Sequence, residues 1–132
     1  MGLENQVLFT GLIQNSELPI LLQKSNIYVS MPETEGVSAS LFEAMACGNF
    51  PIVTDLLGNR SWIKNKENGV LVESKNVEKL AESIIWAFKN SEIRQKAIIE
   101  NRKFVEENAK YSINMKKIAE FYHTLLEQKT TH

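Results

Sequence analysis

The hydrophobic and polar positions along the chain form two kinds of pattern. Short apolar runs, which are typical of strands, occur at Val7–Thr10, Ile27–Ser30, Pro51–Thr54 and Val70–Val72. Apolar residues at helical spacing predict helices over Ser16–Ser25 and Ser38–Cys47 and after Asn76, Ser91 and Ser112. Strands that alternate with helices predict an α/β fold with a Rossmann-like parallel sheet and flanking helices. The unbroken apolar character of Pro51–Thr54 suits a sheet covered on both faces.

Residue types at the helix ends predict where each helix begins and ends. Ser16 can cap the first helix, with Pro19 in the first turn, where its missing N–H costs little. Gly48 is a natural stop for the second helix. Leu57–Lys64 is expected to be a short helix or turn, and Asn68-Gly69 a turn. The helix after Asn76 carries an apolar stripe of Val77, Leu80, Ala81, Ile84, Ile85 and Phe88.

The carboxy-terminal half is expected to be helical throughout. In the helix from Ser91, one side carries Ile93, Ala97, Ile98, Phe104 and Val105. In the helix from Ser112, we expect four residues to point inward, namely Ile118, Phe121, Tyr122 and Leu125. Lys129–His132 is expected to be frayed.

Glu43 is the unusual residue of the second helix. The other residues around it are small or apolar, so the helix is expected to be buried on all sides, and a buried glutamate needs a partner. Ser40 and Glu43 fit the S-x-x-E capping box, which would make Glu43 a purely structural residue. The alternatives are an opening to water or a bound group that donates hydrogen bonds to Glu43.

A ligand site is expected at the carboxyl ends of the parallel strands. Glu35 and Gly36 follow the strand Ile27–Ser30 closely, and Ser38–Ser40 forms the first turn of the next helix. Free N–H groups at a helix start attract phosphate, and Gly36 leaves room for a diphosphate to approach. The arrangement favours a nucleotide diphosphate.

Several blocks of sequence, in this order, resemble one known family. They are VLFTG at Val7–Gly11, the strand Ile27–Pro32, EG at Glu35-Gly36, EAMACG from Glu43, PIVTD, and GNRSWIKNKENGVLV at Gly58–Val72; seven residues separate Glu35 from Glu43. The chain resembles the carboxy-terminal domain of the retaining glycosyltransferases of the glycogen synthase and sucrose synthase type (glycosyl transferases group 1), which have the GT-B fold of two Rossmann domains.

The resemblance implies a function and a set of site residues. Such proteins transfer a sugar from a nucleotide sugar, such as a UDP- or GDP-sugar, to an acceptor with retention at the anomeric carbon, usually without a metal or other cofactor. By resemblance, Glu43 binds the ribose and Glu35 the donor sugar. The backbone of Gly36, Val37, Ser38 and Ala39 would approach the diphosphate and sugar, and Gly11, Leu12 and Ile13 would border the base.

The resemblance also implies that residues 1–132 lack some parts of the family's two-domain fold. The Arg and Lys that the family places early in this domain have no counterpart before Val7, and Ser61 stands where relatives often have Glu. We therefore expect residues 1–132 to be the donor-binding half of a GT-B carboxy-terminal domain, incomplete at its amino-terminal side and inactive alone. The acceptor, a glycan or lipid-linked glycan, would bind the absent domain. We expect Val7–Thr10 to pair with Ile27–Ser30, or sheet edges to form a homodimer, because unpaired edges recruit partners.

Composition excludes several other classes. The 132 residues have a formal net charge of −1, which gives no support for a nucleic-acid partner. Cys47 is the only cysteine and His123 and His132 are the only histidines, so no metal site and no internal disulfide are expected, and Cys47 is expected to be a small core residue. No apolar run reaches the length of a membrane span. The expected location is the cytoplasm, with the inner face of the membrane as an option for the parent protein.

Three rival interpretations stay open. A phosphoacceptor signalling domain would need an acidic pair after the first strand, where Gly11-Leu12-Ile13 stands instead. A catalytically silent structural or interaction domain could keep the same fold, and titration with a nucleoside diphosphate would distinguish it. A sugar-nucleotide epimerase has the same two-domain plan, and product analysis on the full-length parent would separate it from a transferase.

Overall fold

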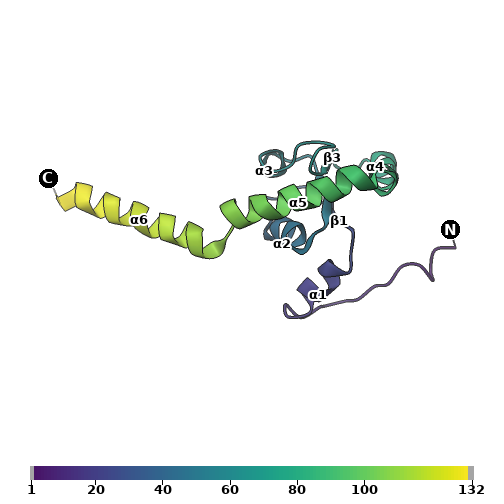
Figure 1. Cartoon of the computed structure of the whole chain (residues 1–132), viewed down its shortest axis with the longest axis horizontal. Helices are drawn as coiled ribbons and strands as arrows, with labels where there is room; N and C mark the ends of the chain where they lie inside the picture. The colour runs from purple at the N-terminus through teal and green to yellow at the C-terminus, as the bar shows by residue number, and fades with distance from the viewer. Residues whose placement is uncertain (1, 131–132) are drawn as a thin grey trace.

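The computed structural model describes residues 2–130 and shows an α/β fold, as predicted. Three strands form one parallel sheet in the order β1-β2-β3, flanked by helices (Figure 1). In chain order the elements are α1 (Leu18–Gln23), β1 (Ile27–Ser30), α2 (Ala39–Cys47), β2 (Phe50–Thr54), α3 (Leu57–Arg60), β3 (Val70–Val72), α4 (Val77–Lys89), α5 (Ser91–Asn108) and α6 (Tyr111–Thr130).

The central strand β2 is buried along its whole length. Val29 of β1 pairs with Ile52 of β2, which in turn pairs with Val70 of β3. One core cluster contains Phe50, Ile52, Val70, Val72, Ala87 and Ala97, and the other contains Leu41, Met45, Val53 and Ile63. Alternate residues of β2 thus enter opposite clusters, because side chains of a strand alternate between faces. The prediction that helices cover this strand on both sides is confirmed.

Local signals fix the ends of α2 and α4, and the predicted stop at Gly48 and cap at Asn76 are confirmed. The Ser38 hydroxyl accepts a hydrogen bond from the Leu41 N–H, and Gly48 ends α2 in the left-handed conformation at φ 91°. The Asn76 side chain caps α4 through the Lys79 N–H at 2.9 Å. For α1, Pro19 lies in the first turn as predicted, but the cap is Glu17, without a side-chain hydrogen bond. The expected cap at Ser16 is therefore wrong.

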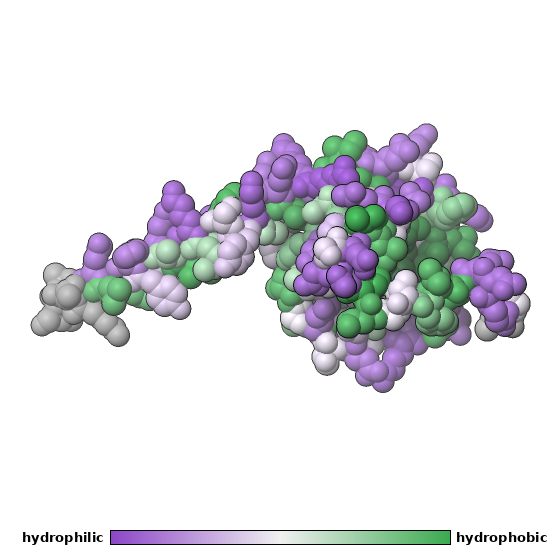
Figure 2. Space-filling model, turned by 90° about the horizontal axis from the view of Figure 1, so that it is seen from below, coloured by the Kyte–Doolittle hydropathy of each residue, from purple (hydrophilic) through white to green (hydrophobic). Residues whose placement is uncertain are grey.

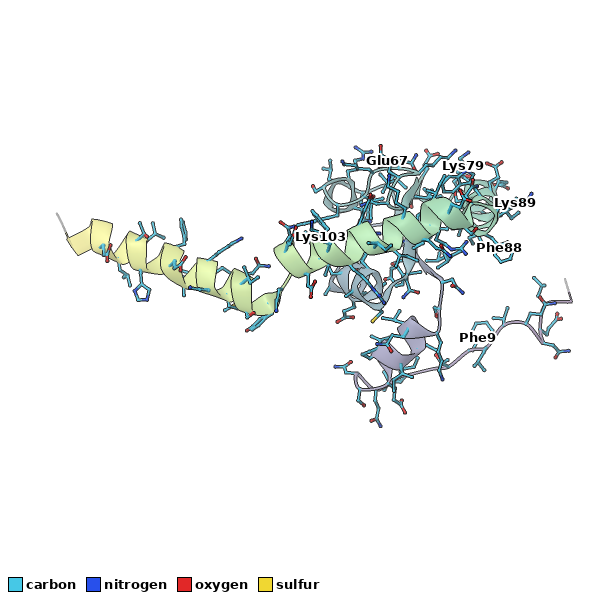
Figure 3. The ribbon with its side chains drawn as sticks, in the orientation of Figure 1. Phe9, Glu67, Lys79, Phe88, Lys89 and Lys103 are labelled. Atoms are coloured by element: carbon cyan, nitrogen blue, oxygen red, sulfur yellow. The ribbon has the colours of Figure 1, made fainter. Side chains whose placement is uncertain are left out.

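The predicted strand Val7–Thr10 is wrong. The segment is extended but belongs to no sheet; it runs apart from the strands, and the helix that it approaches is α1 (Figure 1). Its side chains are exposed, with Leu8 at 83% and Phe9 at 92%, and Figure 3 shows Phe9 standing on this separate segment. Within residues 2–130, β1 pairs with β2 alone. The expected pairing of Val7–Thr10 with β1 within one chain is therefore also wrong.

Two helices expose apolar residues of the predicted helical patterns. On α4 the buried side chains are Ser83 and Ala87, whereas Phe88 of the predicted stripe is 74% exposed. The inward orientation expected for α6 is wrong: this helix projects from the body, and its Phe121 is 62% exposed (Figure 1). Figure 2 shows apolar surface both on the body and along the projecting helix. Leu80 of the α4 stripe packs against the core, whereas Phe88 and the apolar residues of α6 are largely exposed.

The remaining predictions concern short segments. Leu57–Lys64 contains the short helix α3, and Trp62 lies in the turn that follows, between the rings of Phe42 and Phe104. The turn at Asn68-Gly69 is confirmed. Cys47 is half-buried. The helix α6 reaches Thr130, so the expected fraying of Lys129–His132 concerns in part residues 131–132, which lie outside the described chain.

Candidate functional site

The candidate site lies at the carboxyl edge of the sheet. Because all three strands are parallel, the loops that follow Ser30, Thr54 and Val72 leave from the same edge. The first of these loops carries Glu35 and Gly36, both exposed, and leads into the start of α2. The structure therefore brings the predicted acidic loop and the first turn of α2 together, as the sequence indicates.

Glu43 is exposed, so the predicted burial of α2 on all sides is wrong. The helix buries only one face, made by Leu41, Ala44 and Met45. Glu43 lies on the open side, where Ala39 and Ala46 are also exposed. Of the alternatives for this carboxylate, an opening to water is the one that the structure shows.

The capping box of Ser40 and Glu43 is not formed. The residue that caps α2 is Ser38, two positions earlier, and its hydroxyl accepts from the Leu41 N–H at 3.4 Å. In a capping box the glutamate sits three residues after the cap, and that position is Leu41. Glu43 therefore has no structural role in the cap of its helix.

Glu43 lines a cavity of about 330 Å³ between α1 and α2. The other walls come from the start of α1 and the end of α2, and its lining also includes Asn15, Leu18, Pro19, Leu22, Ala46 and Cys47. The wall is mostly apolar, and the Glu43 carboxylate is its one acidic group. Such a combination can hold a flat or sugar-like group and accept hydrogen bonds from its hydroxyls.

Gly11, Leu12 and Ile13 lie on the segment before α1. Leu12 and Ile13 line a second, more open cavity of about 580 Å³ with Phe9, Ile20 and Leu21. Neither of them lines the Glu43 cavity, although Asn15, two residues after Ile13, does. The predicted base loop and Glu43 therefore border opposite sides of α1 and do not share one cavity.

The short helix α3 is a part of the site region that the sequence analysis did not identify. Gly58, in its first turn, approaches the Gly36 carbonyl so closely that a side chain at residue 58 would overlap it. Gly36 itself is different, because a Cβ there would meet nothing within 4 Å. Residues 58–60 (GNR) form part of the family resemblance, but nothing in the sequence near residue 36 or residue 58 indicates that the two are in contact.

Two interactions hold α3 against the end of β2. The buried Asn59 side chain donates from Nδ2 to the Thr54 carbonyl at 2.8 Å. The Arg60 guanidinium donates to the Asp55 carboxylate, and this hydrogen bond holds the pKa of Asp55 below its ordinary value. The same contact raises the pKa of Arg60. Arg60 therefore stays charged but is engaged by Asp55.

A second basic group near this edge of the sheet is Lys75. Its Nζ lies 3.0 Å from Glu33 on the loop that carries Glu35, and both side chains are exposed. Within residues 2–130, no group of three or more His, Cys, Asp or Glu side chains is placed to hold a metal ion. Of the helices that the structure describes, none combines the length and apolar character needed to cross a bilayer.

Comparison with known proteins gives a consistent picture. The model of the family described as glycosyl transferases group 1 matches residues 1–104. An uncharacterized glycosyltransferase of Methanocaldococcus jannaschii is 28% identical over 126 residues, which are 94% of this chain and 32% of the relative. The chain thus spans about a third of the length of this curated relative.

Solved structures share the fold. The carboxy-terminal domain of a group 1 glycosyl transferase (LpcC) from Francisella tularensis is 29% identical, with a TM-score of 0.76, over 83% of this chain and 57% of that one. The Anabaena protein Alr3699/HepE in complex with UDP has a TM-score of 0.86 at 20% identity, over 93% of this chain and 34% of that one. This second likeness concerns the fold alone.

Proposed function

Because the chain belongs to the glycosyl transferases group 1, we propose that it is the donor-binding part of an enzyme that transfers a sugar from a nucleotide sugar to an acceptor with retention. The observation that carries this proposal is the exposure of Glu43 on the open side of α2, beside a cavity and free of any capping role. An acidic residue in an otherwise small and apolar helix is explained if it receives hydrogen bonds from ligand hydroxyls.

The proposed roles follow from the position of each residue. Glu43 would accept hydrogen bonds from the ribose hydroxyls, and Glu35, on the exposed loop, would contact the donor sugar. The backbone of Gly36 to Ala39 would face the diphosphate, and this agrees with the open space around the Gly36 Cα. Gly11, Leu12 and Ile13 would border the base once a ligand or a further part of the protein brings their segment closer.

The chain would supply only the donor side of the reaction. We propose that an acceptor glycan or lipid-linked glycan binds another part of a longer protein, which would act in polysaccharide or glycoconjugate biosynthesis in the cytoplasm or at the inner face of the membrane. UDP is present in the structure of the Anabaena neighbour, so UDP and UDP-glucose are suitable first probes, with GDP and GDP-mannose as the second pair.

A catalytically silent domain is the second candidate. It is favoured because, within residues 2–130, the basic side chains Arg60 and Lys75 at this edge are already paired with Asp55 and Glu33. Helix amides alone would then have to balance the diphosphate charge.

Nuclear magnetic resonance of the labelled chain distinguishes the two candidates, because it detects millimolar binding. We expect a nucleoside diphosphate to shift the amides of Gly36 and Glu43 while leaving Gly69, at the opposite end of the sheet, unchanged. If neither UDP nor GDP shifts any amide of the carboxyl edge at millimolar concentration, the donor-binding proposal is wrong.

A further inference from the structure

Gly58 and Gly36 are two glycines that meet through their backbones. An ideal Cβ on Gly58 would overlap the Gly36 carbonyl oxygen and would lie 3.0 Å from its carbonyl carbon and 3.6 Å from the Val37 nitrogen. Gly58 lies in helix α3 and does not have a positive φ. Its backbone conformation is therefore open to any residue, and only the space is limiting.

The two sides of this contact differ in how firmly they are held. Helix α3 is tied to the buried strand β2 by Asn59, and by Arg60 through Asp55. On the other side, Glu35 and Gly36 make no backbone hydrogen bond to another loop or strand within residues 2–130. If a side chain were added at Gly58, the loop would therefore move rather than the helix.

We propose that Gly58 is a positioning residue for the donor sugar: by bringing the α3 backbone against Gly36, it sets the place of the Glu35 loop at the carboxyl edge of the sheet. This inference rests on the proposed function, because it assigns Gly58 a role in placing the residue that would contact the sugar. It adds α3 to the site as a fixed support beneath the loop.

The variant Gly58→Ala tests the contact with the smallest change. Alanine is a better helix former than glycine, so helix propensity alone predicts a chain of equal or higher thermal stability. The contact between residues 58 and 36 predicts in addition that the alanine side chain displaces the loop that carries Glu35. The control is Gly69→Ala, whose Cβ would meet Ile63 and Pro51 at 2.9 Å, a milder crowding at the other end of the sheet.

Binding is measured by titration of the 132-residue chain and its variants with the nucleotide pair that binds the unmodified chain, UDP with UDP-glucose or GDP with GDP-mannose. We expect Gly58→Ala to weaken the nucleotide sugar by about tenfold, the loss of one hydrogen bond to a charged group, and to change the nucleoside diphosphate less than about twofold. The amides of Gly36 and Val37 should shift without ligand. Gly69→Ala should lower thermal stability and leave the ratio of the two affinities unchanged.

The outcomes separate the inference from the proposed function. If the unmodified chain binds neither pair, the proposed function fails and the role of Gly58 fails with it. If the chain binds but Gly58→Ala leaves both affinities unchanged, or lowers both equally, only the positioning role is overturned. Should Gly58→Ala not fold, Arg60→Gln loosens the same support from the surface, and it must then weaken the nucleotide sugar selectively for the inference to stand.

Discussion

The guanidinium of Arg60 holds the carboxylate of Asp55 through two parallel hydrogen bonds, 2.6 Å from Nε to Oδ1 and 3.1 Å from Nη2 to Oδ2. The pair joins the carboxyl end of β2 to the last residue of α3. Both side chains are partly exposed, and exposed ion pairs contribute little. The geometry is bidentate, however, which is the arrangement in which an exposed pair is most effective.

The first prediction concerns the pH dependence of this pair. The hydrogen bond from Arg60 lowers the pKa of Asp55 below its ordinary value of 3.8. A lowered carboxylate pKa stabilises the fold above the ordinary pKa, and this stabilisation is lost as the pH falls through the folded pKa. We expect Asp55→Asn to lower the thermal midpoint slightly at neutral pH, and this difference from the unmodified chain to shrink as the pH falls below 3.8. A difference that does not change with pH would contradict this assignment.

The second prediction concerns the open space at Gly36. A Cβ there meets nothing within 4 Å and the residue has no positive φ, so Gly36→Ala should leave thermal stability unchanged. If the diphosphate approaches this backbone, the added methyl should weaken nucleoside diphosphate binding by about tenfold, a typical cost of overpacking. Calorimetric unfolding and ligand titration measure the two effects separately. Unchanged affinity in a stable Gly36→Ala chain would place the diphosphate elsewhere.

The elements that the sequence predicted well are those whose signals are local. β1, β2, β3, the cap Asn76 and the stop at Gly48 follow from apolar runs and end residues within a few positions. The exposure of Glu43 was not predictable, because its helix neighbours Ala39 and Ala46 are compatible with either face. The segment Val7–Thr10 could form a strand only by pairing with a neighbouring strand, and within residues 2–130 no strand pairs with it.

The contact of Gly58 with Gly36 shows a second limit of sequence reasoning. The two residues are distant along the chain, and neither has a backbone conformation that only glycine adopts. A single sequence therefore gives no reason to connect them. The same holds for the orientation of α6, whose apolar residues have helical spacing but lie on a helix that projects from the body.

The third prediction concerns activity. Within residues 2–130, the basic side chains Arg60 and Lys75 at this edge of the sheet are each paired with a carboxylate, and the chain spans about a third of the M. jannaschii relative. We expect no detectable sugar transfer by the purified 132-residue chain with any common UDP- or GDP-sugar. A radiolabelled transfer assay with glycan acceptors measures this. Steady turnover to a glycosylated acceptor would show that the chain is a complete enzyme.

The fourth prediction concerns assembly. Phe9 and Leu8 are exposed on an extended segment, and β1 pairs on one side only, so a second copy can add its segment to this edge. We expect a homodimer at high protein concentration by light scattering. Phe9→Ser should shift the chain toward monomer, whereas Ile99→Ser, a change at an exposed residue of α5, should not. A monomer mass for the unmodified chain at the highest concentration rules the dimer out.

The last prediction separates the two glutamates and is best tested in the longer protein that we propose, where binding is expected to be tighter than in the 132-residue chain. If Glu43 holds the ribose, Glu43→Gln should weaken both the nucleoside diphosphate and the nucleotide sugar. If Glu35 holds the sugar, Glu35→Gln should weaken the nucleotide sugar alone. Each hydrogen bond to a charged group contributes ~1.5–3 kcal/mol, so each loss should be about tenfold to a hundredfold.

The control for this experiment is the residue that caps α2. Ser38→Ala removes the hydrogen bond to the Leu41 N–H and should cost about 0.5–2 kcal/mol of stability, toward the lower end because that bond is 3.4 Å long. Glu43→Gln, at an exposed position outside the cap, should leave the stability unchanged. Calorimetry on the three variants gives stability and affinity together. If the Glu43→Gln protein keeps its full affinity for the nucleoside diphosphate, Glu43 does not bind the ribose.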